Sequence, residues 1–378
     1  MPRSIDRVLI TGGAGFIGSY TVDLFLEEGY DVIVVDNLES QVHGGKLPSY
    51  FNPKASITIG DVRDRRVLQE NLRDVDAIIH LAAAVGVGQS MYQVERYVDY
   101  NTRGTATLLD VLINTENRVR KFVVASSMSI YGEGKYFCEK CNRYLNPGLR
   151  DLRQLQERRW EHLCPTCGSE LKPRPTDEEK PLSPTSIYAQ TKRHQEEMCL
   201  LTGKTYGIPT VALRYFNVYG PRQALSNPYT GACAIFTSRI LNNKPPYLFE
   251  DGEQLRDFVH VKDVAKANLL AIERSGADYK AVNIGTGKPT SIKKVAEIIA
   301  KALGSNLKPY ISNRFRKGDI RHCYADISIA KELLGYTPSI EIEEGLKELA
   351  AWASKEKWGA LDLFEKSLRE LEEKGLVG

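Results

Sequence analysis

The stretch that decides the fold is Arg7-Val-Leu-Ile-Thr11, which is followed at once by Gly12-Gly-Ala-Gly15-Phe-Ile-Gly18. Its first five residues have the composition of a short buried strand, and a helical pattern continues from the glycines to Glu28. A strand, a glycine-rich turn and a helix start in this order set backbone N–H groups against a pyrophosphate. The sequence therefore predicts a dinucleotide site here, with a plain glycine-rich turn as the alternative.

The acid at the end of the next expected strand indicates which dinucleotide binds. This strand runs from Asp31 to Val35 and ends at Asp36. A carboxylate at this distance from the glycines suits the adenosine ribose hydroxyls and repels a 2′-phosphate, so the sequence favours NAD over NADP. A further expected strand, Ser56 to Ile59, is followed by Asp61, which we expect beside the adenine.

Strands and helices continue to alternate along the chain. Strands are expected at residues 76–82, 121–125, 208–214 and 281–285, and helices at 92–115 and 187–202. This alternation predicts an α/β protein with a doubly wound parallel sheet. Within it, His80 continues a buried strand and is expected to make a core hydrogen bond rather than to do chemistry. The loop from Val85 to Ser90 is either a ligand contact or an ordinary strand-to-helix connection.

Tyr188 and Lys192 stand four residues apart in a run that contains neither glycine nor proline. On a helix they share one face, where the ammonium would favour the phenolate and lower the pKa of the tyrosine. Tyr188 would then be able to take a proton from a substrate hydroxyl. The spacing alone is a weak signal, because three other pairs share it: Tyr50/Lys54, Tyr131/Lys135 and Tyr136/Lys140. The long helical run selects Tyr188.

Ser127 follows the strand expected at residues 121–125. Hydroxyls at the carboxyl end of a parallel strand lie where such sheets bind ligands. Ser127 is therefore expected either to bridge Tyr188 and a substrate oxygen or only to cap the end of its strand.

Residues 133–180 interrupt the alternation and contain two C-x-x-C pairs, Cys138/Cys141 and Cys164/Cys167. In a chain without a signal for export, such pairs predict a metal site of the ribbon type, with zinc ahead of iron. Four thiolates leave no open coordination position, so the metal would be structural. The remaining three cysteines are scattered and are expected to be packed thiols: Cys199, Cys233 and Cys323.

The composition limits the classes of function. A formal net charge of +3 gives no field that would indicate nucleic acid or a membrane surface as the main partner. No apolar run approaches the length of a membrane-spanning helix, and the first residues lack the apolar region of a signal peptide. A cytoplasmic protein is therefore expected.

The assembled motifs resemble the extended short-chain dehydrogenase/reductases, in particular the NAD-dependent nucleotide-sugar epimerase/dehydratase family. The motifs are T-G-G-A-G-F-I-G (11–18), D-N (36–37), G-D-V (60–62), H-L-A-A (80–83), N-T-R-G-T (101–105), S-S-M-S-I-Y-G (126–132), Y-A-Q-T-K (188–192), R-Y-F-N-V-Y-G-P-R (214–222) and R-D-F-V-H-V-K-D-V (256–264). This resemblance implies a Rossmann domain that binds NAD, a smaller C-terminal lobe for a nucleotide sugar, and a homodimer.

The resemblance also implies roles for individual residues. The catalytic residues would be Ser127, Tyr188 and Lys192. The cofactor contacts would be Gly12, Gly15, Phe16, Ile17, Gly18, Asp36, Asn37, Asp61, Val62, Leu81, Ala82, Ala83 and Asn101, together with Tyr188 and Lys192. The substrate contacts would be Val87, Ser127, Ser129, Asn217, Arg222, Arg256 and Arg321. Among the arginines of the last third, Arg314 and Arg316 are further candidates for a diphosphate.

Residues 128 and 129 bear on the reaction. The 4,6-dehydratases of the family carry Asp-Glu there, whereas this chain has Met128 and Ser129, neither of which serves as the acid or base of an elimination.

Three other features bear on the subfamily. The segments A-A-V-G-V-G-Q-S-M (83–91) and R-Q-A-L-S-N-P-Y-T-G (222–231), together with the cysteine insert, look most like the dTDP-L-rhamnose 4-epimerases. A UDP-hexose 4-epimerase, a 4-reductase and a non-enzymatic NAD-sensing protein that uses the ribbon as an interaction surface are the alternatives.

The domain division follows from these assignments. Residues 1–132 and 181–215 form the expected NAD-binding domain, 133–180 the four-cysteine insert, and 216–378 mainly the substrate lobe, with segments that return to the first domain. The last 35 residues read as two amphipathic surface helices without a chemical role.

Overall fold

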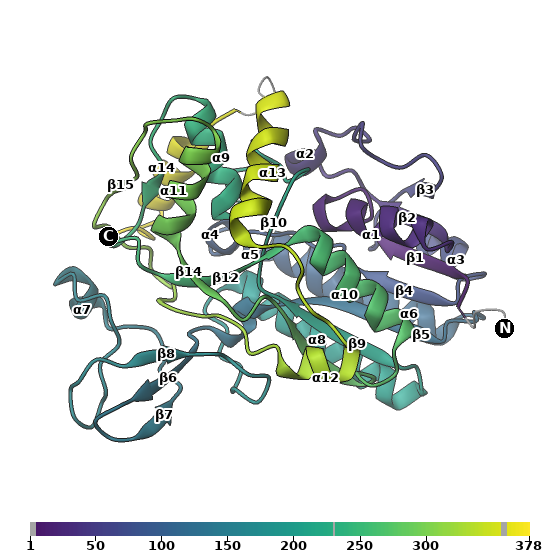
Figure 1. Cartoon of the computed structure of the whole chain (residues 1–378). Coiled ribbons are helices and arrows are strands. Elements are labelled where there is room, and N and C mark those ends of the chain that lie inside the picture. Colours follow the sequence, from purple (N-terminus) through teal and green to yellow (C-terminus); the bar gives the residue numbers. More distant parts are fainter. Residues whose placement is uncertain (1–4, 230, 357–360) are drawn as a thin grey trace.

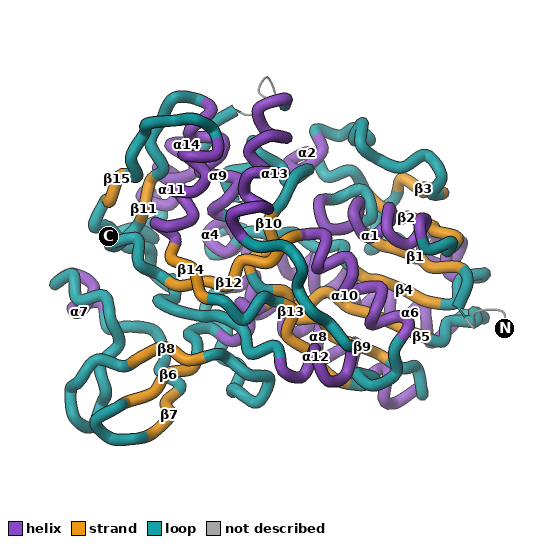
Figure 2. The backbone as a smooth tube through the Cα atoms, in the orientation of Figure 1, coloured by secondary structure: helices purple, strands orange, loops and turns teal. Residues whose placement is uncertain are grey.

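A seven-stranded parallel sheet organises the chain (Figures 1 and 2). In this computed structural model, which describes residues 5–229, 231–356 and 361–378, the strand order is β13-β9-β5-β4-β1-β2-β3. The strands are β1 (Arg7–Thr11), β2 (Asp31–Asp36), β3 (Ser56–Ile59), β4 (Ala77–His80), β5 (Lys121–Ser127), β9 (Thr210–Tyr215) and β13 (Lys280–Ile284). The order reverses between β1 and β4, the point at which such sheets bind ligands. The predicted doubly wound parallel sheet is confirmed.

Helices cover both faces of this sheet. One face carries α1 (Phe16–Glu27), α10 (Val261–Glu273) and α12 (Ser328–Leu334), and the other α3 (Arg65–Leu72), α6 (Gly104–Asn114) and α8 (Ile187–Tyr206). Successive residues of a strand face opposite layers, so Val8 packs in the cluster of α1 and Leu9 in that of α3. Among the described residues, no helix combines the length and the apolar character needed to cross a membrane.

The helix expected over residues 92–115 is interrupted. It consists of α5 (Val94–Tyr97), a π-helical segment (Val98–Arg103) and α6. The π turn contains Asn101, whose side chain accepts a hydrogen bond from the Ala84 amide at 2.7 Å and donates to the Thr191 hydroxyl at 2.9 Å. Such wide turns are frequent at functional sites. Here the turn ties α8 to the loop after β4.

The smaller lobe is built mainly from the last third of the chain. Its sheet contains β10 (Asn217–Tyr219), β12 (Leu255–His260) and β14 (Pro289–Ser291), and β11 (Tyr247–Leu248) pairs with β15 (Tyr310–Ile311). Its helices are α9 (Ala232–Leu241), α11 (Ile292–Ala302), α13 (Ile342–Lys355) and α14 (Phe364–Glu373). Phe236, Val295 and Leu346 belong to its separate apolar core. The other three elements of this third, α10, β13 and α12, lie with the large sheet.

The insert stands apart from the large sheet, at the lower left of Figure 1. It forms a three-stranded antiparallel sheet from β6 (Lys135–Cys138), β7 (Arg143–Leu145) and β8 (Lys172–Arg174), with the short helix α7 (Leu152–Gln156). Tyr136 and Leu171 pack around the cysteines, and Leu155 and Trp160 form a second small cluster with Phe315. So small a core requires an additional source of stability.

Candidate active site

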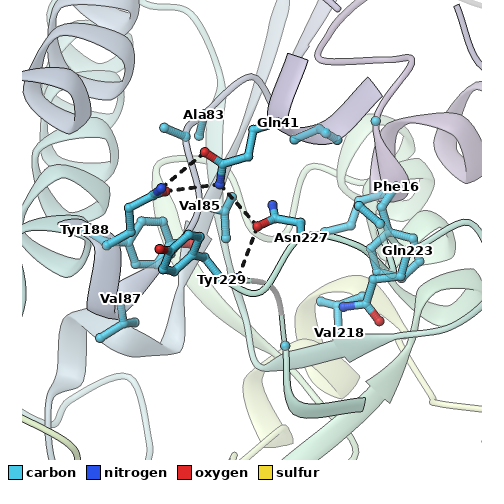
Figure 3. Close-up of a pocket in the computed structure, with 18 of the residues that line it drawn as sticks. Phe16, Gln41, Ala83, Val85, Val87, Tyr188, Val218, Gln223, Asn227 and Tyr229 are labelled. Carbon is cyan, nitrogen blue, oxygen red and sulfur yellow. Dashed lines mark hydrogen bonds between the residues drawn. The ribbon is translucent and has the colours of Figure 1, made fainter. Parts of the chain in front are cut away.

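One cavity of about 890 Å³ extends from the glycine-rich turn into the smaller lobe. The carboxyl ends of β1, β2, β4 and β5 form one wall, and residues of β10, α9 and α14 form the other. Figure 3 shows Tyr188 and Val87 on one side of this cavity and Phe16, Val218 and Gln223 on the other. The cavity therefore joins the predicted cofactor and substrate regions.

The glycine-rich turn leaves no room for side chains. Gly12 has a φ of +72°, and a Cβ at that position would lie 2.8 Å from the Ala82 amide nitrogen. A Cβ at Gly18 would lie 2.1 Å from the carbonyl oxygen of Gly12. Gly15 precedes α1 as its N-cap and provides no capping side chain. A helix start without a cap, at the bottom of an open cavity, fits a pyrophosphate.

Two acids line the part of the cavity where the sequence predicted the adenosine. Asp36 is 6% exposed and accepts hydrogen bonds from the amides of Ala14 at 3.0 Å and Leu38 at 2.9 Å. Burial opposes ionisation of Asp61, but hydrogen bonds from Arg63 and Asn37 outweigh this effect and lower its pKa. A fixed carboxylate at position 36 suits ribose hydroxyls and disfavours an added phosphate.

The three predicted catalytic residues line one part of the cavity. Ser127 ends β5, and its hydroxyl accepts a hydrogen bond from that of Ser129 at 2.9 Å. Tyr188 and Lys192 lie in the first two turns of α8, which Ser186 caps by accepting from an amide. The Tyr188 amide donates to the Ser90 hydroxyl at 3.0 Å. The loop after β4 thus fixes the start of α8.

The expected effect of Lys192 on Tyr188 is contradicted by the structure. Burial raises the pKa of Tyr188 to about 12, and only a hydrogen bond with Ser127 opposes this effect. Burial also lowers the pKa of Lys192 to about 8, and its ammonium donates to Gln195 at 2.9 Å. Burial thus disfavours the charged forms of both side chains, and Lys192 does not lower the pKa of Tyr188 as the sequence predicted. A further positive charge in the cavity would favour the phenolate.

Most of the substrate contacts that the sequence predicted do line the cavity. Besides Ser127, these residues are Val87, Ser129, Asn217, Arg222 and Arg256. The Asn217 side-chain oxygen is buried and has no hydrogen-bond partner among the described residues. Arg222 is paired with Asp23 at 2.7 Å. An unpaired buried acceptor beside a cavity is a natural contact for a ligand donor.

Two predicted contacts lie outside the cavity. Asn101 is fully buried, and its side chain instead forms hydrogen bonds with the Ala84 amide and the Thr191 hydroxyl. The Arg321 side chain is 1% exposed, and carboxylates of Glu161, Glu250 and Asp251 surround its guanidinium. This placement corrects the prediction of a diphosphate contact at Arg321, since its charge is already neutralised by buried acids.

Arg316 lines the cavity instead. Its guanidinium stacks over the Phe249 ring at 4.7 Å and donates to Asp319 at 2.7 Å. The sequence indicated this arginine only as one of several candidates. No local pattern in the sequence distinguished it from the other arginines of this segment.

Comparisons with known proteins identify the family. The chain matches the NAD dependent epimerase/dehydratase family over residues 8–147 and 165–285. It belongs to this family. The dTDP-L-rhamnose 4-epimerase of Burkholderia thailandensis is 35% identical over 354 residues, which are 93% of this chain and 95% of that protein. The recognition of the family, and of an enzyme, from the sequence is confirmed.

Solved structures show the same architecture. The UDP-glucose 4-epimerase of Thermotoga maritima, determined with UDP-glucose, has a TM-score of 0.75 at 33% identity and covers 93% of this chain and 99% of its own. A UDP-glucuronic acid 4-epimerase from Bacillus cereus, determined with UDP-glucuronic acid and NAD, has a TM-score of 0.73 at 26% identity, with 92% and 99% covered.

The C-terminal helix of this epimerase-family protein is part of the cavity, which corrects the expectation of a surface helix without a role. Phe364, Leu368 and Leu371 of α14 line the cavity. The Glu370 carboxylate accepts hydrogen bonds from the hydroxyls of Tyr92, at 2.9 Å, and Tyr229. The spacing of these apolar residues predicted a buried face, but not the cavity on which that face packs.

The four cysteine sulfurs of the insert all lie within 4.8 Å of one another. Cys138 and Cys167 are 3.5 Å apart, and Cys141 and Cys164 are 3.8 Å apart. Four thiolates at zinc–sulfur distances of about 2.3 Å in a tetrahedron would lie ~3.8 Å from one another. The predicted cluster is assembled, and its donor set fits a structural metal ion.

Proposed function

We propose that this enzyme is a nucleotide-sugar 4-epimerase that interconverts dTDP-L-rhamnose and dTDP-6-deoxy-L-talose through a 4-keto intermediate. The observation that carries the proposal is the position of Ser127, Tyr188 and Lys192 in one cavity with the glycine-rich turn. Met128 and Ser129 support epimerisation over dehydration, because neither serves as the acid or base that elimination requires. The relative from Burkholderia thailandensis supports the choice of sugar.

The chain's own residues act on the 4-hydroxyl of the sugar. Tyr188 accepts the proton of that hydroxyl and later returns it, and Ser127 donates a hydrogen bond to the oxygen as it becomes a carbonyl. Lys192, one helical turn after Tyr188 in α8, lines the same cavity, and burial lowers its pKa to about 8. NAD, when bound, would supply the two-electron redox chemistry at carbon 4, and its positive charge would favour the phenolate.

Arg256 and Arg316 are proposed to bind the diphosphate. Both line the lobe side of the cavity, and guanidinium groups pair with phosphate oxygens through two parallel hydrogen bonds. The unpaired side-chain oxygen of Asn217 would accept from a sugar hydroxyl. Arg222 also lines the cavity, but its ion pair with Asp23 ties it to α1 on the glycine-rich side, so we do not assign it to the diphosphate.

The loop after β10 supports a cofactor that stays bound through turnover. Asn227 accepts a hydrogen bond from Gln41 at 3.2 Å (Figure 3). Arg222 forms an ion pair with Asp23 of α1 at 2.7 Å. These contacts join the lobe to both sides of the cofactor region. Thr230 of the same loop lies outside the described residues. An epimerase regenerates NAD in each turnover and does not need to release it.

The purified protein is expected to carry NAD rather than NADP. The buried Asp36 carboxylate would lie beside the 2′-phosphate of NADP and repel it. Denaturing the protein and identifying the released dinucleotide by chromatography measures this preference. A preparation that releases mainly NADP would overturn the role of Asp36.

Incubation with dTDP-, UDP- and GDP-sugars, followed by NMR of the products, tests the reaction and the substrate together. The proposal expects dTDP-L-rhamnose and its C4 epimer to interconvert without added cofactor. UDP-hexose epimerisation is the second candidate, supported by the Thermotoga maritima structure. Stoichiometric NADH consumption would indicate a reductase, and no reaction with any sugar would favour the NAD-sensing alternative.

A second copy of the chain and a zinc ion complete the proposal. Val94, Val98 and Leu201 are 45%, 43% and 68% exposed, and they belong to adjoining helical segments, so a homodimer would cover them. Sedimentation of the purified protein tests this.

The zinc ion is proposed at Cys138, Cys141, Cys164 and Cys167.

A further inference from the structure

Buried ion pairs connect the insert to the smaller lobe. Arg150 of the insert donates to both carboxylate oxygens of Glu250, at 2.9 and 2.8 Å, and the two side chains are 1% and 2% exposed. Glu250 also accepts from Arg321 at 3.0 Å. Removing one partner of such a pair leaves an uncompensated buried charge. The insert is therefore firmly docked.

Two acids of the insert bind the segment that follows the cavity loop: Glu133 binds the backbone of that segment, and Glu161 binds its side chains. Glu133 accepts from the amides of Arg321 and His322, each at 2.8 Å. Burial opposes its ionisation, but His162 and its hydrogen bonds lower the pKa of Glu133 to about 2, so it remains charged. Glu161 accepts from the Arg321 side chain at 2.9 Å and from the His322 imidazole at 2.9 Å.

The same backbone orients Arg256. One guanidinium nitrogen of Arg256 donates to the carbonyl oxygen of Arg321 at 2.8 Å, and another donates to that of Ile320 at 2.7 Å. Arg256 lines the cavity, whereas Arg321 does not. Glu133 therefore fixes the peptide units whose carbonyl oxygens orient Arg256, and Glu161 holds the side chains of Arg321 and His322.

The insert also supports the loop that carries Arg316. Phe315 packs in one cluster with Leu155 and Trp160 of the insert. Arg150 donates to the carbonyl oxygen of Asp319 at 3.3 Å, and the Asp319 carboxylate accepts from Arg316. One face of the insert thus reaches both arginines of the proposed diphosphate site.

We infer that the insert is a positioning unit for the diphosphate of the substrate, acting through Arg256 and Arg316. The inference rests on the proposed function, which provides the diphosphate. The catalytic residues do not depend on the insert in this way: Ser127 belongs to the central sheet, and the start of α8 is held by Ser90. Disturbing the docked face should therefore weaken substrate binding and leave the chemical step nearly intact.

Trp160→Ala tests this inference, with Arg159→Ala as the matched control. Trp160 is 9% exposed and packs in the cluster with Phe315. The adjacent Arg159 side chain is 60% exposed and forms a surface ion pair with Glu157. We expect dTDP and UDP to bind about tenfold more weakly to Trp160→Ala in calorimetry, and KM to rise by a similar factor, with kcat within about twofold. NAD content should not change, Trp160→Phe should restore binding, and Arg159→Ala should match the wild type.

Glu161→Gln provides a second, milder variant, because Glu161 is 30% exposed and the amide keeps its shape. It should weaken UDP binding about threefold while NAD is retained. Unchanged binding of both nucleotides by both folded variants, or a parallel loss of NAD, would overturn the inference. A wild-type protein that binds neither nucleotide would overturn the proposed function as well. A protein that binds them but epimerises no sugar would overturn only the proposed function.

Discussion

Tyr188→Phe is expected to lose nearly all turnover, by a factor on the order of 10²–10⁴, while the fold and the bound NAD remain. The substitution removes only the ionisable oxygen. The ring keeps its edge-on contact with Tyr97, at 6.4 Å between centroids, and the backbone keeps its hydrogen bond to Ser90. Product NMR gives the turnover, and released dinucleotide and thermal unfolding report the cofactor and the fold.

Tyr131→Phe is the control, because Tyr131 also has a lysine four residues later. Its hydroxyl donates to Asn283 and accepts from Arg214, both at 2.8 Å, outside the cavity. This variant should lose roughly 1–3 kcal/mol of stability through unpaired buried groups but keep its turnover per folded molecule. Equal inactivity of the two variants, or an active Tyr188→Phe, would show that Tyr188 is not the base.

The features that the sequence predicted well are those that a short segment determines. Gly12, Gly18 and Asp36 lie in one strand–turn–helix–strand unit, so their spacing alone indicated the cofactor end. Tyr188 was selected by the length of its helix, and α8 begins one residue before it. Short apolar runs also indicated the strands of the large sheet, because a buried parallel strand is apolar on both faces. The edge strand β3 is only partly buried, and its Ser-Ile-Thr-Ile run indicated it nonetheless.

The features that the sequence missed depend on residues far apart in the chain. The partners of Arg321 are 160, 71 and 70 residues away, and no local pattern indicated that they would neutralise it. Glu370 meets Tyr92 and Tyr229 across 278 and 141 residues. The raised pKa of Tyr188 is likewise a consequence of burial, which the spacing to Lys192 does not reveal.

Cys164→Ser is expected to remove the metal and to unfold the insert while the NAD-binding core stays folded. Structural zinc contributes about 10–16 kcal/mol of binding free energy in small domains, far more than the few buried apolar residues around Tyr136 and Leu171 supply. The two cores of the large sheet are separate from this cluster. Metal analysis should show about one zinc or iron per wild-type chain and much less in the variant, and limited proteolysis should cut within residues 133–180.

Cys199→Ser is the matched control for metal content, since Cys199 is buried in the core of the large sheet and lies outside the four-cysteine cluster. It should keep its metal even if its stability falls. Loss of the insert should also release Arg321 and His322, whose backbone amides bond Glu133, so Cys164→Ser should bind UDP and dTDP poorly. A wild-type protein without stoichiometric metal, or a metal-free variant with intact protease resistance and nucleotide affinity, would rule out this role for the cysteines.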